Sequence, residues 1–291
     1  MSEDKNPFPN ENNTGHFWDD DIRELNNRPP RWYMWAFYFG VIMIVGYAFY
    51  YPTIPWFGGH NTGGAKWTAI KEFKEGVAEL ENARKKRFAK QEEAIKNKSL
   101  EEILKDSDLT LYAVKTARVL FGDNCASCHG AGGQGNVGFP VLADDDWLYG
   151  GSVKEIHKTI TSGRKPMMTA HKNVLSESEL ETLANFVMNG AKSSDKKGQS
   201  LYMAKGCIGC HGADKKGNKF LGSANLTDSI WRFRAENQKD SVKKTIKHGV
   251  NFAGDKLTRN AEMPAFGKSE KLTKEQIKKL AIYVHELGGG K

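Results

Sequence analysis

Two stretches of sequence, Cys125-Ala-Ser-Cys128-His129 and Cys207-Ile-Gly-Cys210-His211, contain all four cysteines of this 291-residue chain. Both have the spacing Cys-x-x-Cys-His, which puts two thiols about one helical turn apart with an imidazole directly after them. At this spacing two thiols can hold a haem covalently while the histidine becomes the proximal ligand of the iron. The sequence therefore predicts two covalently bound haem c groups.

A zinc site with four thiolate ligands is the alternative, because Cys-x-x-Cys pairs are also a zinc spacing. Zinc does not explain why a histidine follows both pairs, nor the 82 residues that separate Cys125 from Cys207. A thioredoxin-like redox pair would need a βαβ setting, which surrounds neither motif. Haem remains the expected cofactor.

The two motifs belong to a longer internal repeat, which indicates two copies of one folded unit. Each copy continues with a Leu-x-Asp-x-x-Trp segment, a Lys-Thr-Ile-x-x-Gly segment, a Met-x-Ala segment and a closing helix that begins with a capping box. A short helix ahead of each motif completes a small all-α domain. The matching positions are Trp147 and Trp231, Gly163 and Gly249, Met168 and Met263, Ser176 with Glu179 and Thr273 with Gln276.

The sixth ligand of each iron is expected from the Met-x-Ala segments. Met263 lies on a loop bounded by glycine and proline, and in the first copy the repeat register selects Met168 over its neighbour Met167. Each methionine could instead fill a hydrophobic core, the commoner fate of this residue type. Four histidines are alternative ligands, but none recurs in register: His157, His171, His248 and His285.

Three further residues have possible roles beside a haem. The indole N–H of Trp147 or Trp231 could donate to a buried propionate, although both could simply be core aromatics. Pro140 is expected to present its carbonyl to the second ring nitrogen of His129, and Ala224 stands in the corresponding region for His211.

One membrane span is predicted near the N-terminus. No residue from Trp32 to Gly59 is charged, and Trp32 to Tyr51 gives twenty mainly apolar residues with aromatic side chains at both ends. A buried core helix rarely has this length without a charge. A cleaved signal peptide fits poorly, because about thirty mostly polar residues precede the span and no small-residue cleavage site follows it.

Charge and composition separate the chain into segments. The overall composition, 39% hydrophobic and 27% charged, excludes a polytopic membrane protein, a collagen-like repeat and a disordered tail. Residues 192–291 carry 21 basic and 10 acidic side chains, a surplus that could steer an acidic electron donor or only keep the protein soluble. The expected segments are 1–31 before the span, 32–57 as the anchor, 58–109 as a helical linker, and 110–191 and 192–291 as two cytochrome c domains.

The linker has one apolar face of Trp67, Ile70, Phe73, Val77 and Leu80 at helical spacing. It is expected to be a solvated helical spacer, with docking on a partner subunit as the alternative.

Beyond the repeats, longer motifs give a resemblance. These motifs are Asp20-Asp21-Ile22-x-Glu24-x-x-Asn27-x-x-Pro30-Arg31-Trp32, Gly46-Tyr47 with Tyr51-Pro52, Gly138-Phe139-Pro140-x-Leu142-x-Asp144-x-Asp146-Trp147-Leu148-Tyr149-Gly150-Gly151 and Asn225-Leu226-Thr227-Asp228-x-Ile230-Trp231. With them, the chain resembles the dihaem membrane-anchored subunit (subunit III, the P subunit) of cbb3-type cytochrome c oxidases. It departs from the family pattern at Thr169, where a proline is usual, at Trp231-Arg232-Phe233-Arg234, where Trp-Leu-Tyr-Gly is common, and by some nine extra residues before Met263.

The resemblance implies an all-α protein with one transmembrane helix, a helical linker and two tandem class I cytochrome c domains. It implies electron transfer, one electron at a time, from a soluble donor cytochrome c to a haem-copper catalytic subunit that reduces oxygen and pumps protons in aerobic or microaerobic respiration. A monohaem cytochrome c subunit and a small single-span subunit are further expected partners, and no nucleic acid is expected. The family also implies the bacterial inner membrane, with residues 1–31 cytoplasmic and both haem domains periplasmic.

The implied ligands divide into two sets. Cys125, Cys128, His129 and Met168 would hold one haem, and Cys207, Cys210, His211 and Met263 the other. The alternative is that the two methionines are exchanged between the haems, because the domains are adjacent and pseudo-symmetric. An iron with both axial positions filled has no open site, and the chain has no copper cluster, so no oxygen-reducing centre is expected here.

Two other functions stay open from the sequence. One is a free-standing, membrane-anchored dihaem carrier that serves another reductase or dehydrogenase. The other is a dihaem peroxidase, a true enzyme, which would need one iron able to open its sixth position.

Overall fold

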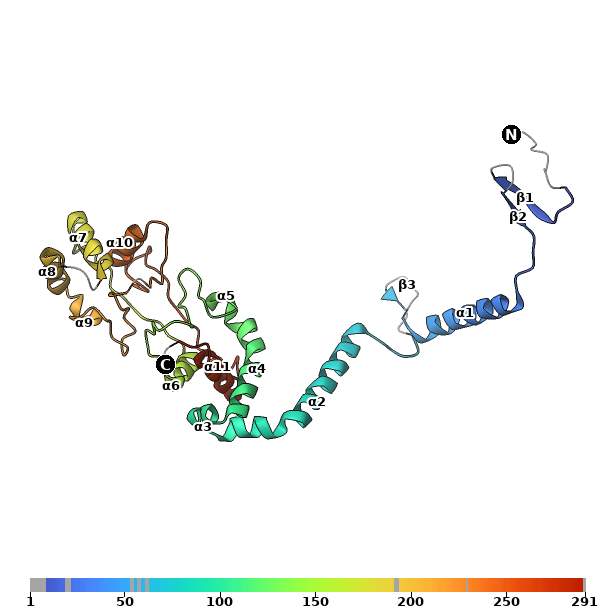
Figure 1. The fold of residues 1–291 in the computed structure, drawn as a ribbon, viewed down its shortest axis with the longest axis horizontal. Helices are drawn as coiled ribbons and strands as arrows, with labels where there is room; N and C mark the ends of the chain where they lie inside the picture. The colour runs from blue at the N-terminus through green and yellow to red at the C-terminus, as the bar shows by residue number, and fades with distance from the viewer. Residues whose placement is uncertain are drawn as a thin grey trace. The chain divides into compact units, whose positions relative to one another are not determined.

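The computed structural model describes residues 9–18, 22–52, 55–56, 59–60, 63–190, 194–228 and 230–289. Asp20 and Asp21 of the motif before the span, and the segment boundaries expected at 57/58 and 191/192, lie outside these residues. Apart from two small two-stranded sheets, the regular structure of the described part is helical, which confirms the all-α prediction. The chain divides into two compact units, Met1–Arg87 and Phe88–Lys291 (Figure 1).

The first unit begins with an antiparallel hairpin of β1 (Asn13–Trp18) and β2 (Ile22–Leu25). No strand is predicted here from the sequence, because neither NTGHFW nor IREL alternates regularly between polar and apolar residues. Exposed side-chain contacts support the pairing: Arg23 pairs with Glu11, and the Thr14 hydroxyl donates to Glu24 at 2.9 Å. A second sheet joins β3 (Pro55–Trp56) to β4 (Gly59–His60).

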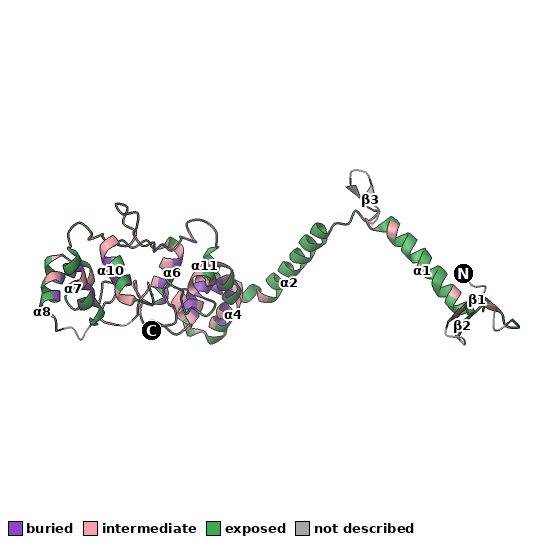
Figure 2. Ribbon diagram, turned by 90° about the horizontal axis from the view of Figure 1, so that it is seen from above, coloured by how far each residue is buried: buried purple, intermediate pink, exposed green. Residues whose placement is uncertain are grey.

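The predicted span is the helix α1 (Arg31–Tyr50). It starts after Pro30, whose φ of −57° suits the residue before a helix, and it ends before Pro52, which cannot continue a helical hydrogen-bond pattern. None of its residues is buried within the protein (Figure 2). Among the described residues it is the one helix long and apolar enough to cross a membrane, which confirms the predicted transmembrane candidate.

The linker is helical, as predicted, and forms α2 (Ala69–Asn97). Just ahead of it, the Gly64 and Ala65 amides donate to the carbonyls of the last turn of α1, at 3.0 and 2.9 Å. The apolar face is exposed, with Ile70 and Phe73 at 69% and 70% of their full accessible surface. The helix is interrupted at Phe88 (φ −112°, ψ 16°), where the second unit begins.

The second unit contains two hydrophobic cores, which appear as two separate groups of buried residues in Figure 2. The first core takes buried side chains from α2, α3, α4, α6 and α11, and the second from α7, α8 and α10. The helices of this unit that follow α2 are α3 (Leu100–Lys105), α4 (Ser107–Asn124), α5 (Ala126–His129), α6 (Val153–Ser162), α7 (Glu177–Met188), α8 (Lys196–Ala204), α9 (Ile208–His211), α10 (Gln238–His248) and α11 (Lys274–His285).

The closing helices do not follow the expected division at 191/192. In that division α7 completes the first repeat and α11 the second, whereas in the structure α11 packs on α4 and α6, and α7 packs on α8 and α10. Each repeat thus contributes its closing helix to the core built around the other repeat's haem motif.

Two glycines at the same repeat position allow the repeats to cross. Gly163 and Gly249 end α6 and α10 with φ of +68° and +70°, a conformation in which side chains other than hydrogen are strained. A Cβ on Gly163 would lie 2.5 Å from the carbonyl oxygen of Met263, and one on Gly249 would lie 2.3 Å from that of Met168. The missing side chains let each methionine segment pass against the helix end of the other repeat.

Residues 88–109, expected in the linker, pack with the first core. Ile95 and Ile103 are completely buried there. Lys278 of α11 donates from Nζ to the carbonyls of Ile95 and Lys96, both at 3.0 Å, and so satisfies oxygens at the C-terminal end of α2. The C-terminal part of α2 is therefore part of the haem-motif unit.

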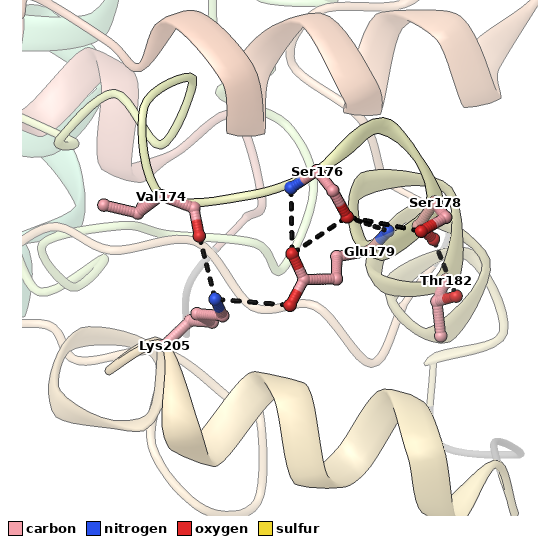
Figure 3. A network of polar contacts seen from close by, with 6 residues as sticks. All are labelled: Val174, Ser176, Ser178, Glu179, Thr182 and Lys205. Carbon is pink, nitrogen blue, oxygen red and sulfur yellow. Dashed lines mark hydrogen bonds and ion pairs between the residues drawn. The ribbon is translucent and has the colours of Figure 1, made fainter.

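A polar network at the start of α7 shows how the exchange is held in the second core (Figure 3). Ser176 and Glu179 form the predicted capping box, with the Ser176 amide 2.8 Å from the Glu179 carboxylate. Lys205, which follows α8, donates to the Val174 carbonyl at 2.8 Å and pairs with Glu179 at 3.3 Å. The first repeat's closing helix is thus joined at its N-terminus to a residue of the second repeat.

Candidate functional site

Both Cys-x-x-Cys-His motifs fold into a short helical turn with the histidine at its end. The turns are α5 and α9, and a longer helix, α4 or α8, precedes each one. The His129 Nδ1–H donates to the Pro140 carbonyl at 3.0 Å, which confirms the role predicted for Pro140. His211 makes the same bond to the Ala224 carbonyl at 2.9 Å. These bonds fix each ring and leave Nε2 as the nitrogen able to bind a metal.

Burial shifts the pKa values of the histidine and of the first cysteine of each motif. Burial lowers the pKa of His129 and of His211, so the neutral imidazole that binds iron is favoured. Burial also raises the pKa of Cys125 to about 11 and raises the pKa of Cys207, which keeps these thiols protonated. Cys125 packs against the first core and Cys207 against the second, so the four thiols do not form one zinc site.

Each methionine packs against the core that contains the other repeat's haem motif. Met263 of the second repeat packs against the first core, together with Cys125, whereas Met168 packs against the second core with Cys207. This packing favours the exchanged arrangement over the unexchanged one. Met167 is 69% exposed, so the structure favours Met168, as the repeat register does.

Backbone pairing between the repeats supports both methionine segments. Met263 and Arg164 exchange two hydrogen bonds of 2.8 and 3.0 Å, and Met168 and Val250 exchange two of 2.9 and 3.0 Å. The two ligand segments are thus paired at equivalent places in the two repeats, which fixes each methionine relative to the core it enters.

These residues fit a covalently attached haem. Each core brings together a half-buried cysteine, a methionine and a tryptophan, next to a histidine whose Nε2 is free of backbone bonding. Two buried side-chain nitrogens among the described residues have no hydrogen-bond partner in the protein, Nδ1 of His171 and Nε of Arg259. Unpaired buried nitrogens of this kind are rare unless another group satisfies them. A haem, when bound, supplies an iron that accepts and releases one electron.

Comparison with known proteins gives the family. A family model described as cytochrome c oxidase, cbb3-type, subunit III matches residues 113–187 and 193–284, and one described as the N-terminal domain of cytochrome oxidase-cbb3, FixP, matches residues 10–58. The chain belongs to the cbb3-type subunit III family. It is 39% identical to the cbb3-type cytochrome c oxidase subunit FixP of Azorhizobium caulinodans over 95% of this chain and 93% of the relative.

Other relatives agree. The chain is 36% identical to FixP of Bradyrhizobium diazoefficiens and 32% identical to the subunit CcoP of Cereibacter sphaeroides, with at least 94% of every chain covered. The predicted family is confirmed, and with it the assignment to a cytochrome c subunit for electron transfer in the oxidase. Membership implies covalently bound haem c and a place within the oxidase complex.

Two of the histidines considered as alternative iron ligands contact carboxylates in this cbb3-type subunit. His248 contacts Asp255 at 2.9 Å and His285 contacts Glu286 at 3.0 Å, each through Nδ1. His171 follows Met168 by three residues and matches Phe266 in the repeat, where the backbone bonds are also equivalent: His171 donates to Ile246, and Phe266 to Ile160, both at 3.1 Å. An apolar residue at the equivalent position favours packing for His171.

The propionate role suggested for Trp147 is wrong. Its indole N–H donates to the carbonyl of Asp144 at 2.9 Å, three residues earlier, and so already has a local acceptor. The tryptophan packs against the first core, which is the alternative that the sequence left open.

Sequence reasoning missed the part that Arg232 plays. Its Nε donates to the Gly138 carbonyl at 3.0 Å, and the Gly138 amide donates back to the Arg232 carbonyl at 2.8 Å. Gly138 lies in the loop between His129 and Pro140, so this pair of bonds joins the second repeat to the haem loop of the first. Burial lowers the pKa of Arg232, and its charge contributes to the lowered pKa of His129. The signal in the sequence is the departure from the usual Trp-Leu-Tyr-Gly.

The extra residues before Met263 form an ordered loop. Asp255 is 5% exposed and accepts from the Leu257 amide at 2.9 Å, contacts His248 and pairs with Lys172 at 3.1 Å. The Leu257 amide bond, followed by the His248 contact, lowers the pKa of Asp255 to about 2. Because Lys172 belongs to the first repeat, this loop also joins the two repeats.

Proposed function

We propose that this oxidase subunit carries two haem c groups and passes electrons, one at a time, from a soluble donor cytochrome c to the haem-copper catalytic subunit. The observation that carries the proposal is the repetition of one arrangement: two haem motifs with the same histidine geometry, each with a cysteine that packs against the same core as a methionine. Two such sites in one unit can act as a relay, which a single site cannot.

The proposed ligand sets are the exchanged ones. Cys125, Cys128 and His129 hold the first haem with Met263 as sixth ligand, and Cys207, Cys210 and His211 hold the second with Met168. The packing of Met263 beside Cys125 and of Met168 beside Cys207 supports this assignment. Each haem is then held by both repeats, so neither 110–191 nor 192–291 is complete without the other.

The role of the chain's own residues is to bind and shield the two irons. Pro140 and Ala224 orient the proximal imidazoles, and apolar helices exclude water from both cores. A thioether as sixth ligand favours a higher reduction potential than a second imidazole would. With a histidine and a methionine as its ligands, each iron would have no open position, so the proposed role is electron transfer and not peroxidase chemistry.

The proposed topology follows from the site of haem attachment. The family attaches haem c outside the cytoplasm, so the unit from Phe88 onward is periplasmic, α1 crosses the bacterial inner membrane once, and residues 1–31 are cytoplasmic. The expected neighbours in the complex are the haem-copper subunit, a monohaem cytochrome c subunit and a small single-span subunit.

Purification in mild detergent tests this function. The proposal predicts two haem c per chain, both low-spin in the oxidised and reduced states, and co-purification with a subunit that contains high-spin haem and copper. A dihaem chain that purifies without such a subunit would instead indicate the free-standing carrier. A high-spin iron in this chain would indicate the peroxidase.

A further inference from the structure

Two arginines lie four residues ahead of the two ligand methionines. Arg164 precedes Met168 by four residues, and Arg259 precedes Met263 by four. All of the extra residues of the second copy lie between Gly249 and Arg259, so the insertion preserves the distance from arginine to methionine.

The structure brings the two guanidinium groups to equivalent places. Cζ of Arg164 lies 4.2 Å from the ring centroid of Tyr149, and Cζ of Arg259 lies 4.5 Å from that of Phe233. Tyr149 and Phe233 each follow a repeat tryptophan by two residues. Each arginine is thus stacked on the equivalent aromatic residue of its own repeat.

Backbone pairing assigns each arginine to one pocket. Arg164 pairs directly with Met263, which enters the first core. The Arg259 amide donates to the carbonyl of Gly249 at 3.1 Å. The next residue, Val250, pairs with Met168, which packs against the second core. Arg164 therefore lies by the pocket of Cys125 and Arg259 by the pocket of Cys207.

The two arginines differ in their partners. Arg164 donates from Nη2 to the Glu155 carboxylate at 3.1 Å and from Nε to the Thr159 hydroxyl at 2.9 Å. In the second repeat Ser241 occupies the position of Glu155, and Arg259 donates from Nη2 to the Ser241 hydroxyl at 2.7 Å. The first guanidinium has a carboxylate partner, whereas the second has a neutral one.

The Arg259 guanidinium lacks a counter-ion within the part of the chain that the structure describes. No carboxylate there forms an ion pair with it, and its Nε is buried without a hydrogen-bond partner. Burial is the cause of its lowered pKa, with no carboxylate opposing it. A partly buried cation with an unused donor is costly unless an anion completes it, and a guanidinium matches a carboxylate well.

We propose that Arg259 binds a propionate carboxylate of the haem at the second site, and that Glu155 withholds Arg164 from this role at the first. The inference rests on the proposed function, since it requires a haem in each pocket. The positive charge of Arg259 favours the reduced haem, which carries one unit less positive charge than the oxidised form. Arg259 is thus a cofactor-binding residue that raises the reduction potential of one haem of the pair.

The test is a redox titration of the full-length two-haem protein in detergent, with haem content measured on the same samples. Arg259→Gln is expected to lower the reduction equilibrium constant of the second haem about tenfold, or about 59 mV for one electron. Arg259→Lys, which keeps the charge, is expected to retain most of the potential. The matched control is Arg164→Gln combined with Glu155→Gln, which removes the ion pair without changing the net charge and is expected to shift the first haem less than twofold.

A second pair of variants exchanges the partners of the two arginines, Glu155 and Ser241, and keeps both arginines in place. It tests the inference even if Arg259→Gln fails to fold. Ser241→Glu gives Arg259 the carboxylate that Arg164 has, and is expected to lower the potential of the second haem. Glu155→Ser removes the carboxylate partner of Arg164 and is expected to raise the reduction potential of the first haem.

Two haems with wild-type potentials in Arg259→Gln, or an unchanged potential of the second haem in Ser241→Glu, would overturn this inference and leave the proposed function standing. Fewer than two haems in the wild-type protein would overturn the proposed function, whatever the arginine variants do.

Discussion

At the scale of single residues, Arg232 connects the two repeats through two hydrogen bonds with Gly138. Its exposed neighbour Arg234 has no hydrogen bond or ion pair with another described residue. The two arginines are two residues apart in sequence and equal in charge, so they separate the effect of the contact from the effect of net charge.

Arg232→Leu, which restores the usual family residue, is expected to destabilise the protein by about 1–3 kcal/mol, because a charged donor is lost and the Gly138 carbonyl loses a partner. Arg234→Leu is expected to change stability by less than about 0.5 kcal/mol. Thermal unfolding of the haem-loaded variants measures both. Equal midpoints for the two variants would contradict the role given to Arg232.

Residue-level reasoning from the sequence predicts the local geometry well and the longer contacts poorly. The bond from His129 to Pro140 and the capping boxes at Ser176 and Thr273 depend on neighbours within a few residues, and all are present in the structure. The bond from Arg232 to Gly138 spans 94 residues, and no spacing rule indicates it. The Trp147 hypothesis failed because a local carbonyl was available as the acceptor.

At the scale of elements, the exchange of α7 and α11 is the main difference from the expected domains. The two closing helices have the same apolar positions and the same capping boxes, so either would complete either core. Sequence periodicity therefore identifies the helices but not their partners. Their partners are determined by the crossing of the methionine segments at Gly163 and Gly249.

Substitution of these glycines tests the crossing. Gly163→Ala or Gly249→Ala is expected to destabilise the protein by more than about 1 kcal/mol, because a side chain at positive φ is strained and its Cβ would meet a backbone oxygen. Gly76→Ala, in the exposed part of α2 with open space around it, is expected to stabilise by up to about 1 kcal/mol. Calorimetric midpoints that fall equally in all three variants would contradict this account.

The loop before Met263 should be sensitive to acid through Asp255. Its pKa of about 2 lies below its ordinary value of 3.8, so its stabilising contribution is complete above about pH 4 and is lost as the pH falls toward 2. Asp255→Asn is therefore expected to lower the unfolding temperature at neutral pH, with the difference from wild type shrinking below pH 4. The exposed Glu236→Gln serves as control, and a difference that is constant across this range would contradict the assignment.

At the scale of the whole molecule, the basic surplus of residues 192–291 is partly used internally. Lys243 pairs with Glu181 at 2.9 Å, Lys205 pairs with Glu179, and Lys247 pairs with Glu177. All three carboxylates belong to α7 of the first repeat, so the charge asymmetry that the sequence reveals also serves the exchanged packing. The net charge of a segment alone does not separate this use from the steering of a donor.

The boundary of the haem-bearing unit makes a prediction for truncated chains. Residues 88–291, exported behind a cleavable signal, are expected to give a soluble protein with two haems. Residues 110–291 lack Ile95, Ile103 and Leu109 of the first core, each contributing about 1.5–3 kcal/mol of burial, and are expected to lose the first haem or unfold. Equal haem content and thermal midpoints for the two fragments would place the boundary at 110 instead.

The exchanged methionine ligands are tested most directly in a chain that attaches only the second haem, made by Cys125→Ala with Cys128→Ala. The measurement is the midpoint potential of that haem after a second substitution, because histidine in place of methionine lowers the potential. The account predicts that Met168→His lowers it and that Met263→His leaves it unchanged. A potential that falls with Met263→His and not with Met168→His would contradict the exchange.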